Sequence, residues 1–97
     1  MSKLSFEWDD KKSKINIKKH GISFDEAKTV FFDANARVIS DQDSLNNEDR
    51  FVILGLSYTL RLLTICHCYR ENEEIIRIIS ARKATQKESK TYGGFLL

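Results

Sequence analysis

The 97-residue sequence has no proline, four glycines, two cysteines and no long apolar run. The lack of proline favours compact, regular elements, because proline interrupts helices and sheet ladders. No segment approaches the roughly 18 apolar residues that span a bilayer, and the N-terminus lacks the apolar core of a signal peptide. We therefore expect a cytoplasmic protein without membrane contact. At this length, with 41% hydrophobic and 31% charged residues, one folded domain over residues 1–97 is expected.

Metal ligands and common catalytic motifs are also scarce. Cys66 and Cys68 lie one residue apart, so they point to the same side of a strand and do not easily close a disulfide. With His67 and His20 they are the candidate zinc ligands, and no C-x-x-C pair is present. Glycine-rich phosphate loops and the G-x-S-x-G and H-E-x-x-H motifs are absent. We predict no metal and no cofactor.

The formal net charge of +2 is too small to indicate a nucleic-acid-binding protein by itself. Its distribution is uneven, with +3 over residues 1–22, −5 over residues 23–49 and +4 over residues 50–97. Basic ends can present one positive face to a phosphate backbone if the fold brings them together. An ordinary solvated surface explains the pattern equally well.

The N-terminal third predicts a short strand and two helices. Residues 6–8 alternate apolar and polar side chains, and Asp9 is a suitable N-cap for a lysine-rich helix over residues 10–20 with a cationic outer face. A capping box that begins at Ser23 predicts a second helix from about Phe24 to Phe32.

In the rest of the chain, apolar and polar residues follow the period of β-strands. Strands are expected over residues 36–40, 50–56, 61–69 and 75–80. The polar residues 81–92 predict a final helix. The order strand, two helices, four-strand meander and C-terminal helix predicts an α+β domain, with the helices packed on one face of a small antiparallel sheet.

Candidate chemistry concentrates between Arg61 and Lys83. A hairpin centred near Asn72 would place His67 opposite Arg77 on a solvated face. That face would carry Arg61, Leu63, Ile65, His67, Tyr69, Ile75, Arg77 and Ile79. The core face would carry Leu62, Thr64, Cys66, Cys68, Ile76 and Ile78.

Basic residues are dense in this segment, since Arg70, Arg77, Arg82 and Lys83 fall within 14 positions with His67 beside them. Such a cluster suits a phosphodiester. RNA cleavage through its own 2′-hydroxyl needs a base, an acid and cations that stabilise the transition state, but no metal. His67 could serve as base or acid. The alternative is that these side chains are only the polar tips of a half-exposed sheet.

The sequence resembles the BrnT family, ribonuclease toxins of bacterial type II toxin–antitoxin pairs with a RelE-like fold. The matching residues are F-E-W-D at 6–9, Asn16, K-H-G-I-S-F-D-E-A at 19–27, Glu48, Arg50, Gly55, R-L-L at 61–63, I-R-I-I-S-A-R-K-A at 76–84, Glu88 and Tyr92. The family often has glycine before R-L-L, where this chain has Leu60. The resemblance implies a metal-independent endoribonuclease that inhibits translation.

The predicted site combines this resemblance with the basic cluster. The catalytic candidates are His67, Arg70, Arg77, Arg82 and Tyr92, and the RNA-binding candidates are Lys19, His20, Arg61 and Lys83. The resemblance also implies a BrnA-like antitoxin that represses the shared operon by binding operator DNA, in a 2:2 assembly, with the isolated toxin a monomer. Two other functions stay open: a non-catalytic basic interaction module and a gyrase-poisoning RelE-like toxin.

Overall fold

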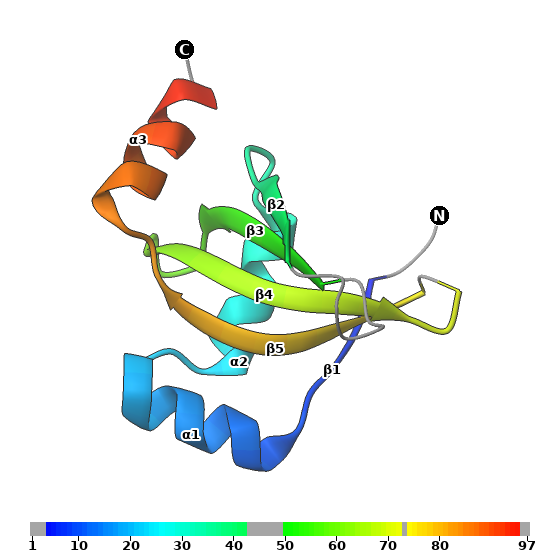
Figure 1. Ribbon diagram of the computed structural model, residues 1–97. Coiled ribbons are helices and arrows are strands. Elements are labelled where there is room, and N and C mark those ends of the chain that lie inside the picture. Colours follow the sequence, from blue (N-terminus) through cyan, green and yellow to red (C-terminus); the bar gives the residue numbers. More distant parts are fainter. Residues whose placement is uncertain (1–3, 43–49, 73, 96–97) are drawn as a thin grey trace.

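The computed structural model describes residues 4–42, 50–72 and 74–95. Its five-stranded sheet has the order β1-β5-β4-β3-β2 (Figure 1). The strands are β1 (Ser5–Glu7), β2 (Arg37–Gln42), β3 (Arg50–Leu56), β4 (Leu62–Arg70) and β5 (Ile75–Lys83). The α+β class is confirmed, but the sheet is mixed and not purely antiparallel, because β1 pairs in parallel with β5 at its edge.

The helices are α1 (Asp10–His20), α2 (Phe24–Thr29), the 3-10 turn η1 (Val30–Phe32) and α3 (Gln86–Phe95). The first three cover the two helical ranges that the local sequence predicts, 10–20 and 24–32. Asp9 caps α1 by accepting the amides of Lys11 and Lys12, and Ser23 caps α2 by accepting the amide of Glu26 at 3.0 Å. Gly21 ends α1 at a φ of 71°. None of the described helices is both long and apolar enough to cross a membrane.

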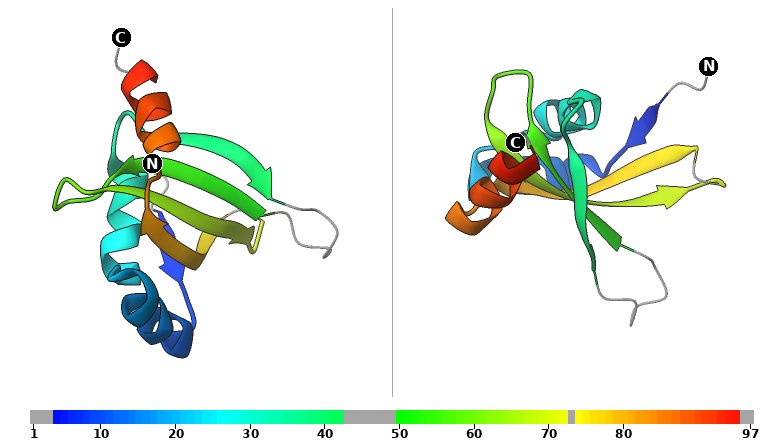
Figure 2. Two further views of the ribbon diagram at one scale, coloured as in Figure 1. Left: turned by 60° about the vertical axis from the view of Figure 1, so that its left-hand side comes forward. Right: turned by 90° about the horizontal axis from the view of Figure 1, so that it is seen from above.

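The core lies between the sheet and the pair α1 and α2, which occupy the same side of it (Figure 2). Its buried side chains are Ile22, Phe24, Ala27, Val30, Ile53, Leu63, Ile65, Ile78 and Ala81. Both helices contact β5, so this strand connects the helical layer with the rest of the sheet.

The register of the β4–β5 hairpin corrects the sequence prediction. His67 pairs with Ile78 and Cys68 with Arg77, so His67 and Arg77 lie on opposite faces. Farther from the turn, a bulge between the pairs of His67 and Cys66 leaves Ile79 of β5 without a partner and brings Arg82 to the same face as Arg77. The predicted core face is therefore correct for Ile78 in β5 but inverted in β4.

The end of β5 also differs from the prediction. Residues 81–83, which were expected to begin the last helix, continue the strand by pairing with residues 63–65 of β4. The helix α3 begins only at Gln86, after Thr85. Ladder hydrogen bonds to β4 override the helix propensity of this polar segment.

Leu60 occupies the turn between β3 and β4 with a φ of 64°, the left-handed conformation that glycine adopts most easily. Its amide donates to the carbonyl of Ser57 at 2.9 Å, and the amide of Ser57 donates to the carbonyl of Arg61 at 2.9 Å. The turn therefore forms with leucine at this position.

Candidate functional site

A groove crosses the face of the sheet opposite α1 and α2, which we call the open sheet face. The groove has a volume of about 270 Å³. Its lining consists of Ile39, Val52, Thr64, Cys66, Ser80, Arg82 and Glu88. Strands β2 to β5 supply all of these except Glu88, which comes from α3. The start of α3 therefore closes one end of the groove.

Arg82 is the main cation of the groove, and Glu88 holds its guanidinium at two points. The Nη1 and Nη2 atoms donate to the two carboxylate oxygens of Glu88 at 2.8 and 3.0 Å. Glu88 also accepts from Thr64 Oγ1 and from the amide of Thr85, both at 2.9 Å. The hydrogen bonds from Arg82 lower the pKa of Glu88 to about 2, so the carboxylate is ionised at neutral pH. The Arg82 side chain is still 42% exposed, which leaves it accessible to an anion.

Arg70 and Arg77 lie on the same face but nearer the other end of the sheet. Both contact the carboxylate of Glu7 in β1, Arg77 through Nη1 at 2.7 Å and Arg70 through Nε at 3.4 Å. Arg77 and Arg82 are five residues apart on β5, about 16 Å along the strand. The structure thus places the three predicted arginines on one face, in two groups.

His67 lies on the opposite side of the sheet from these arginines, inside the core. Its side chain is fully buried among aromatic rings, with centroids 4.8 Å from Phe31, 6.0 Å from Phe51 and 5.4 Å from Tyr69. Burial lowers the pKa of His67, and its Nε2 has no hydrogen-bond partner among the described residues. An RNA phosphate could not contact this ring without opening the core.

Tyr92 is buried and connects α3 to the body of the protein. Its hydroxyl donates to Asp33 Oδ2 at 2.7 Å, and the same oxygen accepts the amide of Leu56 at 2.8 Å. Burial, together with the Asp33 carboxylate, raises the pKa of Tyr92 to about 12. Tyr92 therefore fixes the position of α3, and with it that of Glu88 beside Arg82.

The four predicted RNA-binding residues are dispersed. Lys19 and His20 are exposed in the last turn of α1, and Lys83 is exposed at the end of β5. Arg61 forms a bidentate ion pair with the buried carboxylate of Glu26. Arg61 therefore ties α2 to the β3–β4 turn, while the other three side chains reach solvent.

Sequence reasoning did not assign roles to Glu88, Thr64 or Arg50. The spacing of Thr85 and Glu88 is that of a capping box, a signal present in the sequence that would have placed Glu88 at the start of a helix. Arg50, the first residue of β3, buries its Nε without a hydrogen-bond partner among the described residues. Its charge also lowers the pKa of Cys66, against a larger raising effect of burial.

Comparison with known proteins shows which family the chain belongs to. The sequence profile of a family described as "Ribonuclease toxin, BrnT, of type II toxin-antitoxin system" matches residues 8–88. A solved structure, the Brucella abortus ribonuclease toxin BrnT, superposes with a TM-score of 0.66 at 23% identity, over 87% of this chain and 100% of that one. At this identity the superposition shows a shared fold. No protein of curated function matches the sequence. The profile spans Arg70, Arg77, Arg82 and Glu88, and the chain belongs to the BrnT family of ribonuclease toxins of type II toxin–antitoxin systems.

Proposed function

We propose that this chain is a metal-independent endoribonuclease that acts in the cytoplasm and inhibits translation by cleaving RNA at the groove of the open sheet face. The observation that carries this proposal is the pair Arg82 and Glu88, a half-exposed guanidinium held by an ionised carboxylate in a groove. Arg82 supplies positive charge for a phosphodiester, and Glu88 supplies a proton acceptor beside it.

Cleavage proceeds by attack of the RNA 2′-oxygen on the adjacent phosphorus, with breakage of the bond from phosphorus to the 5′-oxygen. The products are a 2′,3′-cyclic phosphate and a 5′-hydroxyl. Glu88 accepts the proton of the 2′-hydroxyl, Arg82 stabilises the charge on the non-bridging oxygens, and water in the groove supplies a proton to the leaving oxygen. A phosphate that draws Arg82 away from Glu88 also removes the contact that lowers the pKa of Glu88. Substrate binding would thus strengthen the base.

The remaining predicted residues have different parts in this proposal. Arg70 and Arg77 contact the RNA backbone at the far end of the open sheet face, and Lys83 does so beyond Arg82. Tyr92 is a positioning residue that holds α3. His67 is left outside the catalytic group because it is buried in the core. Arg61, which was predicted to bind RNA, is left outside the RNA-binding group because it joins the β3–β4 turn to Glu26 of α2.

Membership of a type II family implies an antitoxin partner. We propose that the partner is BrnA-like, that the assembly contains two copies of each chain, and that the antitoxin carries the operator-binding domain. An antitoxin can silence the enzyme by covering the cationic face or by holding it in an occluded assembly.

The test is incubation of RNA with the purified chain, freed of antitoxin, in excess chelator. We expect cleavage with 2′,3′-cyclic phosphate ends, and loss of cleavage in Arg82→Gln. The control is Lys90→Gln, which removes one charge from the exposed side of α3. Chelator-sensitive cleavage would contradict metal independence. RNA binding without cleavage would favour a basic interaction module, and intact RNA with DNA damage in expressing cells would favour a gyrase poison.

A further inference from the structure

Two groups of cations differ in whether carboxylates pair with them. In the sheet or directly before β4, Arg61 pairs with Glu26, Arg82 with Glu88, and both Arg70 and Arg77 with Glu7. The helix α1 carries five exposed lysines, and within the described part of the chain none of them forms an ion pair. We call this group the α1 lysine ridge; its members are Lys11, Lys12, Lys14, Lys18 and Lys19.

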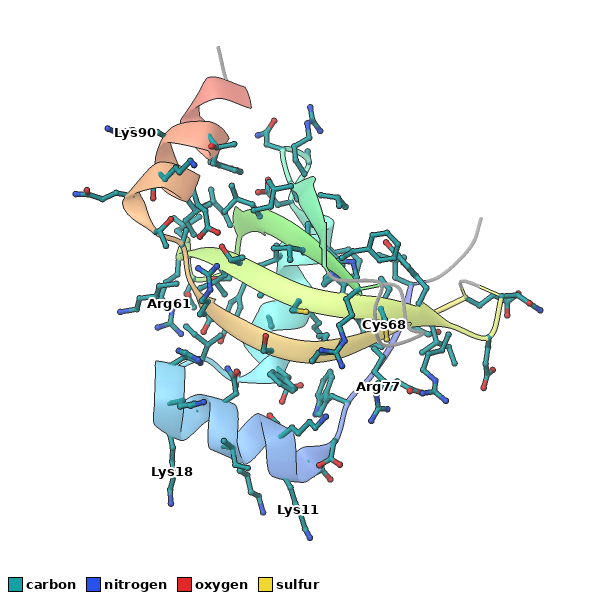
Figure 3. All side chains as sticks on the ribbon, in the orientation of Figure 1. Lys11, Lys18, Arg61, Cys68, Arg77 and Lys90 are labelled. Atoms are coloured by element: carbon teal, nitrogen blue, oxygen red, sulfur yellow. The ribbon has the colours of Figure 1, made fainter. Side chains whose placement is uncertain are left out.

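The five lysines share one side of the helix. At about 100° per residue they occupy an arc of about 160°, opposite the side of α1 that contacts the protein. Figure 3 shows Lys11 and Lys18 pointing away from the sheet. The exposed Ile15 lies within the arc, and Asp10 in the first turn is the one acidic residue of the helix. The ridge is therefore a nearly uncompensated positive surface.

The ridge is not what holds α1 to the sheet, although Lys18 and Lys19 suit the C-terminal end of the helix dipole. Lys11 and Lys14 are three residues apart and Lys14 and Lys18 four, spacings at which like charges repel and weaken a helix. The one buried residue of α1 is Asn16. Its Nδ2 donates to the carbonyls of Ile22 and Ala81, both at 2.8 Å, and its Oδ1 accepts the amide of Ala81 at 3.1 Å. Uncharged polar side chains on the outer face would leave these contacts unchanged.

Asn16 also fixes the ridge relative to the groove. Ala81, its partner in β5, directly precedes Arg82. The lysines are therefore held at a constant position with respect to the residue that we place at the scissile phosphate. The ridge and the groove lie on opposite sides of the sheet, so a substrate that contacts both must be longer than the groove and pass round an edge of the sheet.

We propose that the α1 lysine ridge binds the phosphodiester backbone of single-stranded RNA outside the groove, as a second contact surface for the substrate. The proposal rests on the proposed function for the identity of the polyanion. Lysine is depleted at protein–protein interfaces, whereas lysine contacts to phosphates are a main source of nucleic-acid affinity. Lysines bind phosphates as point charges, so the ridge gives affinity without sequence preference.

The test compares two double variants that remove the same charge. Lys14→Gln/Lys18→Gln changes the ridge, and Lys87→Gln/Lys90→Gln changes exposed lysines of α3. The probes are single-stranded RNAs of about 30 and about six nucleotides, and binding is measured by fluorescence anisotropy over a range of salt concentrations. Single-turnover cleavage of the short RNA is measured in parallel.

We expect the ridge variant to lose about tenfold or more in affinity for the long RNA at low salt, with its salt slope reduced by about 1.4, or about 0.7 for each lost contact. The α3 variant should lose much less, and Lys14→Arg/Lys18→Arg should bind as wild type. Cleavage of the short RNA should be the same in all variants. The ridge proposal fails if both Gln variants weaken binding equally, if neither does, or if polyglutamate competes as well as RNA.

These outcomes separate the ridge from the proposed function. If a ridge variant binds long RNA normally and still cleaves RNA, the ridge proposal is wrong and the ribonuclease proposal stands. If the wild type binds RNA through the ridge but does not cleave it, the ribonuclease proposal is wrong and the ridge proposal stands.

Discussion

Asn16 and Ala81 are joined by a reciprocal pair of hydrogen bonds, the side-chain amide of one bonding to both the carbonyl and the amide of the other. Loss of the side chain leaves the two buried backbone groups of Ala81 without these partners. We expect Asn16→Ala to destabilise the protein by about 2–4 kcal/mol, measured by denaturant unfolding. Ile15→Ala on the exposed side of the same helix should stay within about 0.5 kcal/mol of wild type. Similar values for the two variants would show that Asn16 does not anchor α1.

Arg82→Ala should reduce RNA cleavage by about 100-fold or more while the protein stays folded. The change removes the cation beside the proposed scissile phosphate and no apolar core group. Glu88→Gln should also lower the rate, since the amide cannot accept the proton. Cleavage rates and circular dichroism are measured together. If a folded Arg82→Ala protein cleaves RNA at the wild-type rate, the proposed site is wrong.

Ile78→Ala should destabilise the protein by about 2–5 kcal/mol, because it leaves a cavity beneath α1 and α2. Ile78 is 1% exposed, whereas Ile17 is 46% exposed and provides the same substitution on the surface. Unfolding midpoints in urea measure both variants. If Ile78→Ala is as stable as Ile17→Ala, the core does not lie on this side of β5.

Stability should fall as the pH is lowered from about 4.5 to about 2. Hydrogen bonds from Arg61, Ser57 and Thr59 lower the pKa of Glu26 from its ordinary 4.5 to about 2. A carboxylate with a lower pKa in the folded state stabilises the protein above its unfolded pKa, and that contribution is lost as the pH approaches 2. For Glu26 the loss should be about 1–3 kcal/mol, measured by urea unfolding at each pH. In Glu26→Gln the free energy of unfolding should depend less on pH in this range. An unchanged pH dependence would show that other groups cause it.

The isolated chain should be a monomer, and its complex with the antitoxin should contain two copies of it. We expect the antitoxin dimer to join them with little direct contact between toxins. Light scattering on each sample measures the mass. A complex with a single toxin, or a stable toxin homodimer, would contradict the proposed assembly.

Local signals in the sequence predicted the N-terminal helices well. Asp9 and Ser23 cap their helices through contacts two or three residues away, so their effect can be deduced without the rest of the fold. The positions of the strands were also predictable from their apolar runs. The predicted antiparallel meander of β2 to β5 is also confirmed. The place of β1 was not predictable, because its parallel pairing with β5 joins residues 70 positions apart.

The candidate site shows the same limit. The density of arginines pointed to Arg77 and Arg82, but the hairpin pairs His67 with Ile78 and not with Arg77, so the ring lies in the core while the arginines lie on the open sheet face. The bulge at Ile79 of β5 places Arg82 on the same face as Arg77. A bulge is set by pairing across two strands and has no signature in one of them. The partner of Arg82 was missed because α3 was expected five residues too early, which hid the capping box of Thr85 and Glu88.

The pairing of β1 with β5 has a consequence for biosynthesis. The first strand of the chain has no partner until the last strand has left the ribosome, and the Ala81 contact of Asn16 becomes available only at the same late stage. Contacts of such long sequence separation form slowly and late in folding. Until β5 has been made and released, the nascent chain therefore carries neither a finished sheet nor a fixed α1.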